Sequence, residues 1–295
     1  MDRETPIGVI GLGLMGSALT ARLIDAGMGV IGFDVDAAKR DGLRASGAQF
    51  AGFAAEVAAR CRTVVIAVYD AAQVEGLLPD IANATLPPLV ICTTTCAPGE
   101  IKAIADFAER SHLALIEAPI SGTSAEVRAG TATALVAGDA DVIDAATATL
   151  EMLCPKRINV GAIGNASRTK LAINLILQNN RAALAEGIAF AESLGLDGAS
   201  FLATARQSAA YSAVMDSKGE KMLARDFSPQ SHIAQTLKDT ELILREGRRH
   251  GLPLPMTAAQ AGLLRAAIAL EGADSDSAAV IEAIRARRGQ SEGNS

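Results

Sequence analysis

The sequence predicts an α/β, doubly wound parallel sheet followed by an all-α carboxy-terminal domain. Up to residue 163, short runs of β-branched residues alternate with Ala-rich helical stretches. Such alternation is typical of parallel strands joined by crossover helices. After Gly164 the strand pattern stops, and only helical stretches follow. Because 295 residues exceed the usual size of one domain, we expect two domains, residues 1–163 and 164–295.

The amino-terminal half contains strand patterns that are separated by helical ones. The expected strands are Ile7–Ile10, Gly29–Phe33, Thr63–Val68, Leu89–Cys92 and Leu113–Glu117. The expected helices between them are Gly13–Gly27, Ala37–Ser46, Gly52–Arg60 and Gly99–Arg110. A further pair of strands, Thr131–Ala137 and Arg157–Val160, flanks a helix near Asp139–Met152. We expect this pair to extend the same sheet.

The carboxy-terminal half begins with one long helix, expected at about residues 166–194. This stretch contains no proline, and Gly187 is its single interior glycine. Its length exceeds that of an average helix, which indicates a helix that joins the two domains. Further helices follow, with breaks expected at Gly195–Gly198, Phe227–Pro229 and Gly251–Pro255.

Composition and charge argue against several classes of protein. A formal net charge of −6 and a pI near 5.2 do not suit a nucleic-acid binder. No apolar run reaches the roughly 18 residues of a membrane-spanning helix, and no signal-like segment opens the chain. The 4 cysteines form no CxxC pair and no zinc spacing with the 3 histidines. We therefore expect a cytoplasmic protein with reduced cysteines, bound to no metal, membrane or nucleic acid.

A glycine-rich motif directly follows the first expected strand and directly precedes the first expected helix. Residues 11–16 read Gly-Leu-Gly-Leu-Met-Gly, the GxGxxG pattern of a Rossmann-type dinucleotide site. Gly11 permits a tight turn, Gly13 lets a pyrophosphate approach the backbone, and Gly16 lets helix and strand pack closely. Leu14 and Met15 complete the loop, and we expect the N–H groups at this helix start to face the phosphates.

Asp34, at the end of the second expected strand, has the spacing of the acidic residue that binds the adenine ribose. Its carboxylate can accept hydrogen bonds from both ribose hydroxyls, and it would repel the additional phosphate of NADP. No arginine follows it immediately, so NAD is expected as the cofactor rather than NADP. The alternative is a loop aspartate that caps the helix beginning near Asp36.

Two later strand ends are expected at the same edge of the sheet, because ligands bind at the carboxyl ends of parallel strands. One carries Val68 and Tyr69, and the other carries Thr94 and Thr95. Their hydroxyls are suited to the ribose or to the nicotinamide amide. Threonines at strand ends also satisfy turns, and the pattern leaves both interpretations open.

Lys170 and Asn174 are spaced one helical turn apart in the long helix, and Gln178 and Arg181 continue the same polar stripe. The residues around the stripe are apolar, so the helix is expected to be buried on most sides. We expect the stripe to face a cleft, with an exposed hydrophilic face as the alternative.

Four blocks of sequence follow one another in an order that is typical of a known family. The first is the glycine motif, and the second is Ala-Pro-Ile-Ser-Gly at residues 118–122, with Gly-Thr downstream at 130–131. The third, at residues 161–174, matches GxxGxGxxxKxxxN except at its third glycine; the fourth is Arg-Asp-Phe-Ser-Pro at 225–229 with Lys-Asp at 238–239. Together they resemble the β-hydroxyacid dehydrogenase family over essentially the whole chain. That family includes 3-hydroxyisobutyrate dehydrogenase and tartronate semialdehyde reductase.

The resemblance implies a role for several of these residues. Lys170 would be the general acid/base, which protonates the alkoxide in carbonyl reduction and accepts the proton in alcohol oxidation. Because the pKa of free lysine is too high for such a base, we expect burial or neighbouring cations to lower it. Asn174 would hold the substrate hydroxyl or fix the lysine, and Ser121 with the backbone of Gly122 would bind a substrate carboxylate. Lys238 would lie near the nicotinamide, unless it only pairs with its acidic neighbour.

Three positions depart from the pattern of the family. Thr123 replaces a glycine and brings bulk and a hydroxyl close to the acid group of the substrate. Ala166 replaces the third glycine of the lysine segment, and His232 stands where an apolar or aromatic residue is usual. Thr123 and His232 indicate a more polar or larger acid, although His232 could equally be a surface residue.

The resemblance therefore implies an NAD-dependent dehydrogenase that interconverts a small 3-hydroxy acid and its aldehyde or keto acid. It also implies a carboxy-terminal domain like that of 6-phosphogluconate dehydrogenase. An imine reductase has a similar fold but typically lacks a lysine at the position of Lys170. A non-catalytic cofactor-binding protein is a further alternative, against which Lys170, Asn174 and Ser121 argue together. The Ala-rich, apolar carboxy-terminal half predicts a homodimer or homotetramer.

Overall fold

The computed structural model describes residues 5–292. The chain divides into two compact units, of which the first ends at Lys170 and the second begins at Leu171. The division falls inside the long helix, seven residues after the predicted domain boundary at 163/164, and that boundary stays a prediction.

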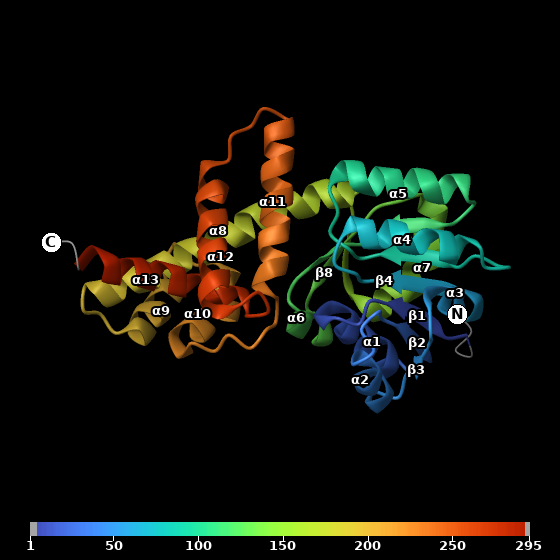
Figure 1. Cartoon of the computed structure of the whole chain (residues 1–295), viewed down its shortest axis with the longest axis horizontal. Coiled ribbons are helices and arrows are strands. Elements are labelled where there is room, and N and C mark those ends of the chain that lie inside the picture. The colour runs from blue at the N-terminus through green and yellow to red at the C-terminus, as the bar shows by residue number, and fades with distance from the viewer. Residues whose placement is uncertain (1–4, 293–295) are drawn as a thin grey trace. The chain divides into compact units, whose positions relative to one another are not determined.

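A parallel sheet of 6 strands forms the centre of the first unit (Figure 1). Its strands are β1 (Ile7–Ile10), β2 (Val30–Phe33), β3 (Gln49–Phe50), β4 (Thr63–Ile66), β5 (Leu89–Cys92) and β6 (Leu115–Glu117). They are ordered β3-β2-β1-β4-β5-β6, with β1 between β2 and β4. Because every neighbouring pair runs parallel, the carboxyl ends of all these strands lie at one edge of the sheet.

Helices cover both faces of this sheet. The connecting helices are α1 (Leu14–Asp25), α2 (Lys39–Ala45), α3 (Ala54–Arg60), α4 (Ala71–Ala82) and α5 (Pro98–Arg110). Successive strand residues point to opposite faces, so Val9 packs in one apolar cluster with Leu19 of α1. Ile10 packs in another cluster with Val57 of α3 and Ile104 of α5. This arrangement confirms the predicted doubly wound α/β class.

The strand pair predicted to extend the main sheet forms a separate sheet of 3 strands, so that prediction was wrong. The strands of this second sheet are β7 (Ile120–Ser121), β8 (Thr133–Val136) and β9 (Lys156–Asn159). Pro119 has no N–H to continue the ladder after β6, and the chain turns into β7, which pairs antiparallel with β8. An isolated bridge between Glu117 and Ala137 links the two sheets. The helices α6 (Ser124–Arg128) and α7 (Ala140–Leu153) connect the strands of the second sheet.

The second unit is helical, as predicted. The long helix α8 (Asn165–Ser193) starts in the first unit and continues into the second. It is followed by α9 (Gly198–Arg206), α10 (Ala213–Ala224), α11 (Ile233–Arg249), α12 (Pro255–Glu271), a short 3-10 helix (Ser277–Ala279) and α13 (Val280–Glu292). Ile188 of α8, Leu202 of α9 and Leu264 of α12 share one apolar core with Ile281 of α13. Within residues 5–292, no helix has the length and apolar character needed to span a membrane.

Candidate active site

The glycine turn at residues 11–16 joins β1 to α1. Gly11 has a φ of +90°, and a Cβ atom there would lie 2.5 Å from a carbonyl oxygen of the loop after β4. A Cβ at Gly16 would lie 1.8 Å from the carbonyl oxygen of Gly11, so a larger residue would push α1 away. At Gly13 the Cβ position meets no non-adjacent atom of the described residues within 4 Å, which leaves its backbone open to a phosphate. Leu14 and Met15 form the half-buried first turn of α1.

Asp34 at the end of β2 is 8% exposed and binds the glycine turn directly. Its Oδ2 accepts the N–H of Leu12 at 2.7 Å and lies 3.1 Å from Nζ of Lys39, while its Oδ1 accepts the N–H of Asp36 at 2.8 Å. Burial raises the pKa of this carboxyl, but the hydrogen bonds and the lysine outweigh burial and hold the pKa below its ordinary value. The N-cap residue of α2 is Ala38, so neither aspartate is the cap of that helix.

The loops after β4 and β5 lie at the same sheet edge as the glycine turn. Thr94 is 5% exposed, and its hydroxyl donates to the carbonyl oxygen of Val68 at 3.1 Å, which joins the two loops. Tyr69 is largely exposed, Thr95 is half-buried, and Asp70 is the N-cap of α4. The hydroxyl of Thr94 therefore satisfies a turn, and contacts of Tyr69 and Thr95 with a cofactor stay a prediction.

The predicted substrate segment lies in the second sheet of the first unit. Ser121 ends β7 and is half-buried. Gly122 has a φ of +149°, and a Cβ atom there would lie 2.8 Å from the Cβ of Ala132. Thr123 is the N-cap of α6, with its hydroxyl accepting the N–H of Glu126 at 3.2 Å and its own N–H donating to the Glu126 carboxylate at 2.6 Å. The hydroxyl at position 123 thus caps a helix.

Lys170 lies in the second turn of α8 and is 6% exposed. The start of this helix is held by Glu117, the last residue of β6, which is 1% exposed. The Glu117 carboxylate accepts the N–H of Gly164, the N–H of Ala166 at 3.0 Å, and both the N–H and the hydroxyl of Ser167 at 3.1 and 2.8 Å. Glu117 could not be identified from the sequence, because these partners lie 47 to 50 residues further along the chain.

Asn174 follows one turn further along α8, is 4% exposed and belongs to the second unit. Its Nδ2 donates to Oδ2 of Asp239 in α11 over 3.0 Å. Nζ of Lys238 lies 3.2 Å from Oδ1 of the same carboxylate. The structure therefore brings two predicted site residues together through Asp239, which the sequence analysis quoted as part of a motif but did not place in the site. The Lys238 side chain is only 14% exposed, so this is not a solvated surface pair.

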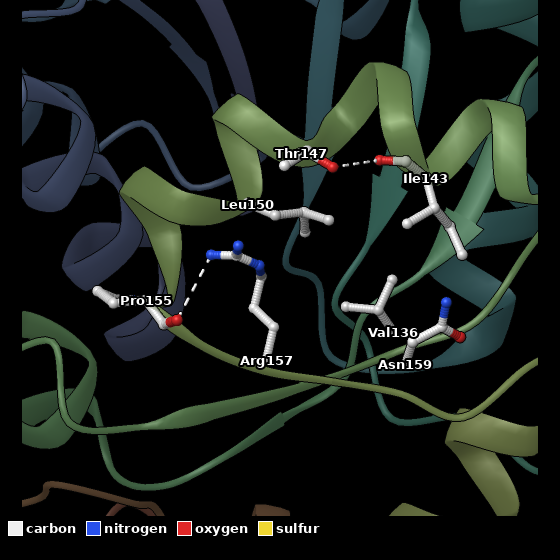
Figure 2. Close-up of a pocket in the computed structure, with 7 residues that line it drawn as sticks. All are labelled: Val136, Ile143, Thr147, Leu150, Pro155, Arg157 and Asn159. Atoms are coloured by element: carbon white, nitrogen blue, oxygen red, sulfur yellow. Dashed lines mark hydrogen bonds between the residues drawn. The ribbon is translucent and has the colours of Figure 1, made fainter.

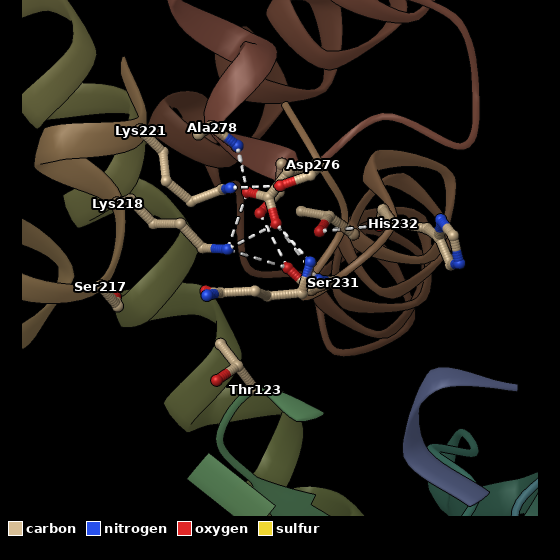
Figure 3. Close-up of polar contacts among 12 residues, drawn as sticks. Thr123, Ser217, Lys218, Lys221, Ser231, His232, Asp276 and Ala278 are labelled. Atoms are coloured by element: carbon tan, nitrogen blue, oxygen red, sulfur yellow. Dashed lines mark hydrogen bonds and ion pairs between the residues drawn. The ribbon is translucent and has the colours of Figure 1, made fainter. Parts of the chain in front are cut away.

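His232 is the N-cap residue of α11, and its Nδ1 lies 2.8 Å from the carbonyl oxygen of Asp274. The loop before it is fixed by Asp276, a fully buried residue whose carboxylate accepts the N–H groups of residues 230 and 231 (Figure 3). Both oxygens of Asp276 accept from Nζ of Lys218, at 2.7 and 2.8 Å. Burial lowers the pKa of Lys218 to about 8, although Asp276 opposes this shift. A buried ion pair thus anchors the segment that carries His232.

Surface hollows of the described residues include two that differ in their relation to the predicted site. One of about 250 Å³ lies between α7 and the second sheet and contains no candidate residue (Figure 2). It is lined by Val136, Ile143, Thr147, Leu150, Pro155, Arg157 and Asn159. The other, of about 360 Å³, lies along α11 and α12 and includes Lys238. In the part of the chain that the structure describes, no group of three or more His, Cys, Asp or Glu side chains could hold a metal ion.

Two family models cover nearly the whole chain. The NAD binding domain of 6-phosphogluconate dehydrogenase matches residues 6–162. The NAD-binding domain of NADP-dependent 3-hydroxyisobutyrate dehydrogenase matches residues 164–284. L-threonate dehydrogenase from Cupriavidus necator is 30% identical over 280 residues, which are 93% of this chain and 94% of that protein. Probable 3-hydroxyisobutyrate dehydrogenase-like 3, mitochondrial, from Arabidopsis thaliana is 32% identical over 80% of this chain and 75% of that protein.

Solved structures agree with these relatives. Mycobacterium tuberculosis 3-hydroxyisobutyrate dehydrogenase with L-serine has a TM-score of 0.83 and 27% identity, covering 95% of this chain and 99% of that one. An imine reductase from Pseudomonas sp. has a TM-score of 0.66 over the same shares but 23% identity, which shows a shared fold alone. The glycine turn and the ordered sequence blocks agree with these matches. The chain therefore belongs to the β-hydroxyacid dehydrogenase family, whose members are NAD(P)-dependent dehydrogenases that act on the CH–OH groups of hydroxy acids.

Proposed function

We propose that this protein is an NAD-dependent dehydrogenase that interconverts a small 3-hydroxy acid and its aldehyde or keto acid, with Lys170 as the general acid/base. The observation that carries the proposal is the burial of an amine at position 170, one helical turn before Asn174 on the same helix. A buried amine on the helix that also carries Asn174 is shielded from bulk water, which suits a group that exchanges a proton with a bound substrate.

The cofactor preference rests on the residues around the glycine turn. Gly13 leaves space for the pyrophosphate, and Asp34 would bind the adenine ribose. Asp34 already accepts hydrogen bonds from Leu12, Asp36 and Lys39, so a carboxylate with about four acceptor positions retains room for a ribose hydroxyl. Lys39 favours NADP, because its half-exposed ammonium could turn to the additional phosphate, and the family model that matches residues 164–284 is also that of an NADP-dependent enzyme. When bound, NAD supplies the hydride acceptor.

The substrate class rests on Ser121 and Gly122. The Ser121 hydroxyl and the N–H of Gly122 are neutral hydrogen-bond donors, which suit a carboxylate. The hydroxyl of Thr123 caps α6, and Nδ1 of His232 contacts the carbonyl oxygen of Asp274. Thr123 and His232 remain proposed substrate contacts. We propose that the carboxylate of the substrate lies nearer to Ser121 than to either of them. The named relatives make 3-hydroxyisobutyrate and L-threonate the first compounds to assay.

In the oxidation direction, the neutral amine of Lys170 accepts the proton of the substrate hydroxyl. The hydride leaves the carbon that carries this hydroxyl. In reduction, the ammonium returns that proton to the developing alkoxide. Asn174 orients the reacting oxygen, and Asp239 restricts the rotation of that amide. These steps need no metal ion, because a positioned ammonium can stabilise the oxyanion.

The test is NADH formation by the purified protein with a panel of 3-hydroxy acids, run in parallel with NADP and with a cyclic imine plus NADPH. Lys170→Ala should abolish turnover and leave NAD binding intact, whereas Lys102→Ala, at an exposed lysine of α5, should behave like the wild type. Unchanged turnover in Lys170→Ala contradicts the proposed role, and turnover of the imine alone favours an imine reductase.

A further inference from the structure

We infer that Glu117 is a positioning residue, which fixes Lys170 against the two sheets of the first unit; this inference rests on the proposed role of Lys170. Glu117 itself contacts no reacting atom in this account. It acts through the start of α8, the helix that carries the lysine.

The carboxylate of Glu117 replaces a local helix cap. The first N–H groups of any helix have no partner within the helix, and a side chain near in sequence usually accepts them. Here the N–H groups of Gly164, Ala166 and Ser167 converge on Glu117 together with the Ser167 hydroxyl. Gly161 and Gly164 have φ values of +94° and +93°, conformations that let the loop curl round the carboxylate.

This cap differs from a local one in what it joins. Glu117 belongs to β6, whose neighbour β5 ends in the loop with Thr94 and Thr95. Its backbone also exchanges two hydrogen bonds with Ala137, directly after β8, at 3.0 and 2.9 Å. The opposite end of β8 pairs with β7, where Ser121 lies opposite Thr133. One buried residue therefore ties the lysine helix to the cofactor sheet and to the sheet that carries Ser121.

The cost of burying the Glu117 carboxylate indicates more than ordinary packing of the helix. A buried carboxylate is costly unless its hydrogen bonds are made, and an apolar residue with a local cap would meet the needs of the helix alone. The charge also interacts favourably with the positive end of the helix dipole. A local cap would not fix the distance from Lys170 to the two sheets. This distance matters because a misplacement of a catalytic group by about 1 Å can reduce a rate about a hundredfold.

Glu117→Gln tests this, because glutamine keeps the shape but has one acceptor oxygen where the carboxylate has two. We expect kcat to fall about tenfold or more, while the KM for NAD stays within about twofold, since the glycine turn and Asp34 are untouched. Amide hydrogen exchange should quicken at residues 164–170 and not in β1 or α1. Ser167→Ala, which removes one of the accepted hydrogen bonds, should show a smaller change of the same kind.

The matched control is Glu100→Gln. Glu100 also caps a helix with its carboxylate, accepting the N–H of Ala97 at 2.7 Å, but that helix, α5, carries no proposed catalytic residue. Wild-type kcat in Glu117→Gln, beside an inactive Lys170→Ala, would overturn the positioning role alone. Equal losses of NAD binding and kcat would also overturn it, because they indicate general damage to the unit. If Lys170→Ala keeps full turnover, the proposed function fails. In that case, amide hydrogen exchange at residues 164–170 of Glu117→Gln that matches the wild type would overturn the role of Glu117 independently.

Discussion

The side-chain amide of Asn174 donates to the carboxylate of Asp239 over 3.0 Å, and both residues are buried. The carboxylate also pairs with Lys238 at 3.2 Å, so a single acidic group connects the amide and the lysine that the sequence analysis had selected separately. Nδ2 carries two protons, so one can bind Asp239 while, in the proposed mechanism, the other donates to the substrate oxygen whose own proton goes to Lys170.

Asp239→Asn should lower kcat/KM by about tenfold to a hundredfold, because Asn174 loses its charged partner and its orientation. It should also destabilise the second unit, since Lys238 would lose its counter-charge. Steady-state kinetics and thermal unfolding measure the two effects. Glu241→Gln, on the same helix but in an exposed pair with Arg265, is the control and should change neither quantity appreciably. Wild-type kinetics in Asp239→Asn would show that the orientation of Asn174 does not matter.

Asp34→Asn should relax the preference for NAD. The substitution removes the charge that repels a 2′-phosphate and leaves Lys39 free to attract it. We expect the ratio of kcat/KM with NADP to that with NAD to rise by about tenfold or more. Asp36→Asn removes a neighbouring charge that does not contact Leu12 and should leave the ratio unchanged. A wild type that already prefers NADP would contradict the proposed cofactor.

The buried pair of Lys218 and Asp276 predicts a pH dependence of stability. Burial lowers the pKa of Lys218 to about 8, below its ordinary value of 10.5. Between these pH values the unfolded chain binds more protons than the folded one, so the free energy of unfolding should rise with pH. One such proton corresponds to about 1.4 kcal/mol per pH unit.

Denaturant unfolding between pH 7 and pH 11 measures this slope. Lys218→Met should lose this contribution and also unfold more easily at pH 7, because Asp276 would remain buried without its cation. Lys221→Met, on the same helix and paired with Asp226, should keep the slope. If Lys218→Met keeps the pH dependence of the free energy of unfolding, other titrating groups cause it.

Self-association, predicted from the apolar carboxy-terminal half, has a candidate surface near the end of α8. Phe190 and Leu194 are 65% and 62% exposed, more than large apolar side chains usually are. Phe190→Glu should lower the mass measured by light scattering at micromolar concentration. Leu86→Glu, at an equally exposed site of the first unit, should not. A wild type that is monomeric would refute the predicted homo-oligomer.

Where local sequence carried the information, the fold could be predicted closely. β1 and β5 have the predicted bounds, and α8 differs from its expected range by one residue at each end. α4 was missed, because Gly76 and Pro79 inside it weaken the helical pattern. β7 was missed because a strand of 2 residues has no period to detect, and without β7 the second sheet could not be foreseen.

The candidate site shows the same division. The glycine turn and Asp34 form a pattern within some twenty residues, so their spacing was informative. Glu117 and Asp239 act through partners 47 and 65 residues away, and no local pattern reports such contacts. Thr123 was read as a substrate contact from its position alone, whereas its capping of α6 could have been read from Thr123 and Glu126, which form a capping-box pattern.

The central claim is that Lys170 moves the proton, and the pH dependence of kcat/KM for oxidation of the best hydroxy acid tests it most directly. The wild-type rate of oxidation should rise with pH, because a general base must be unprotonated to accept the proton of the substrate. Lys170→Met, with NAD binding within about twofold, should be slower by about 10² to 10⁴-fold and should lose that rise. A Lys170→Met variant that keeps the wild-type rate and the same pH limb would contradict the account.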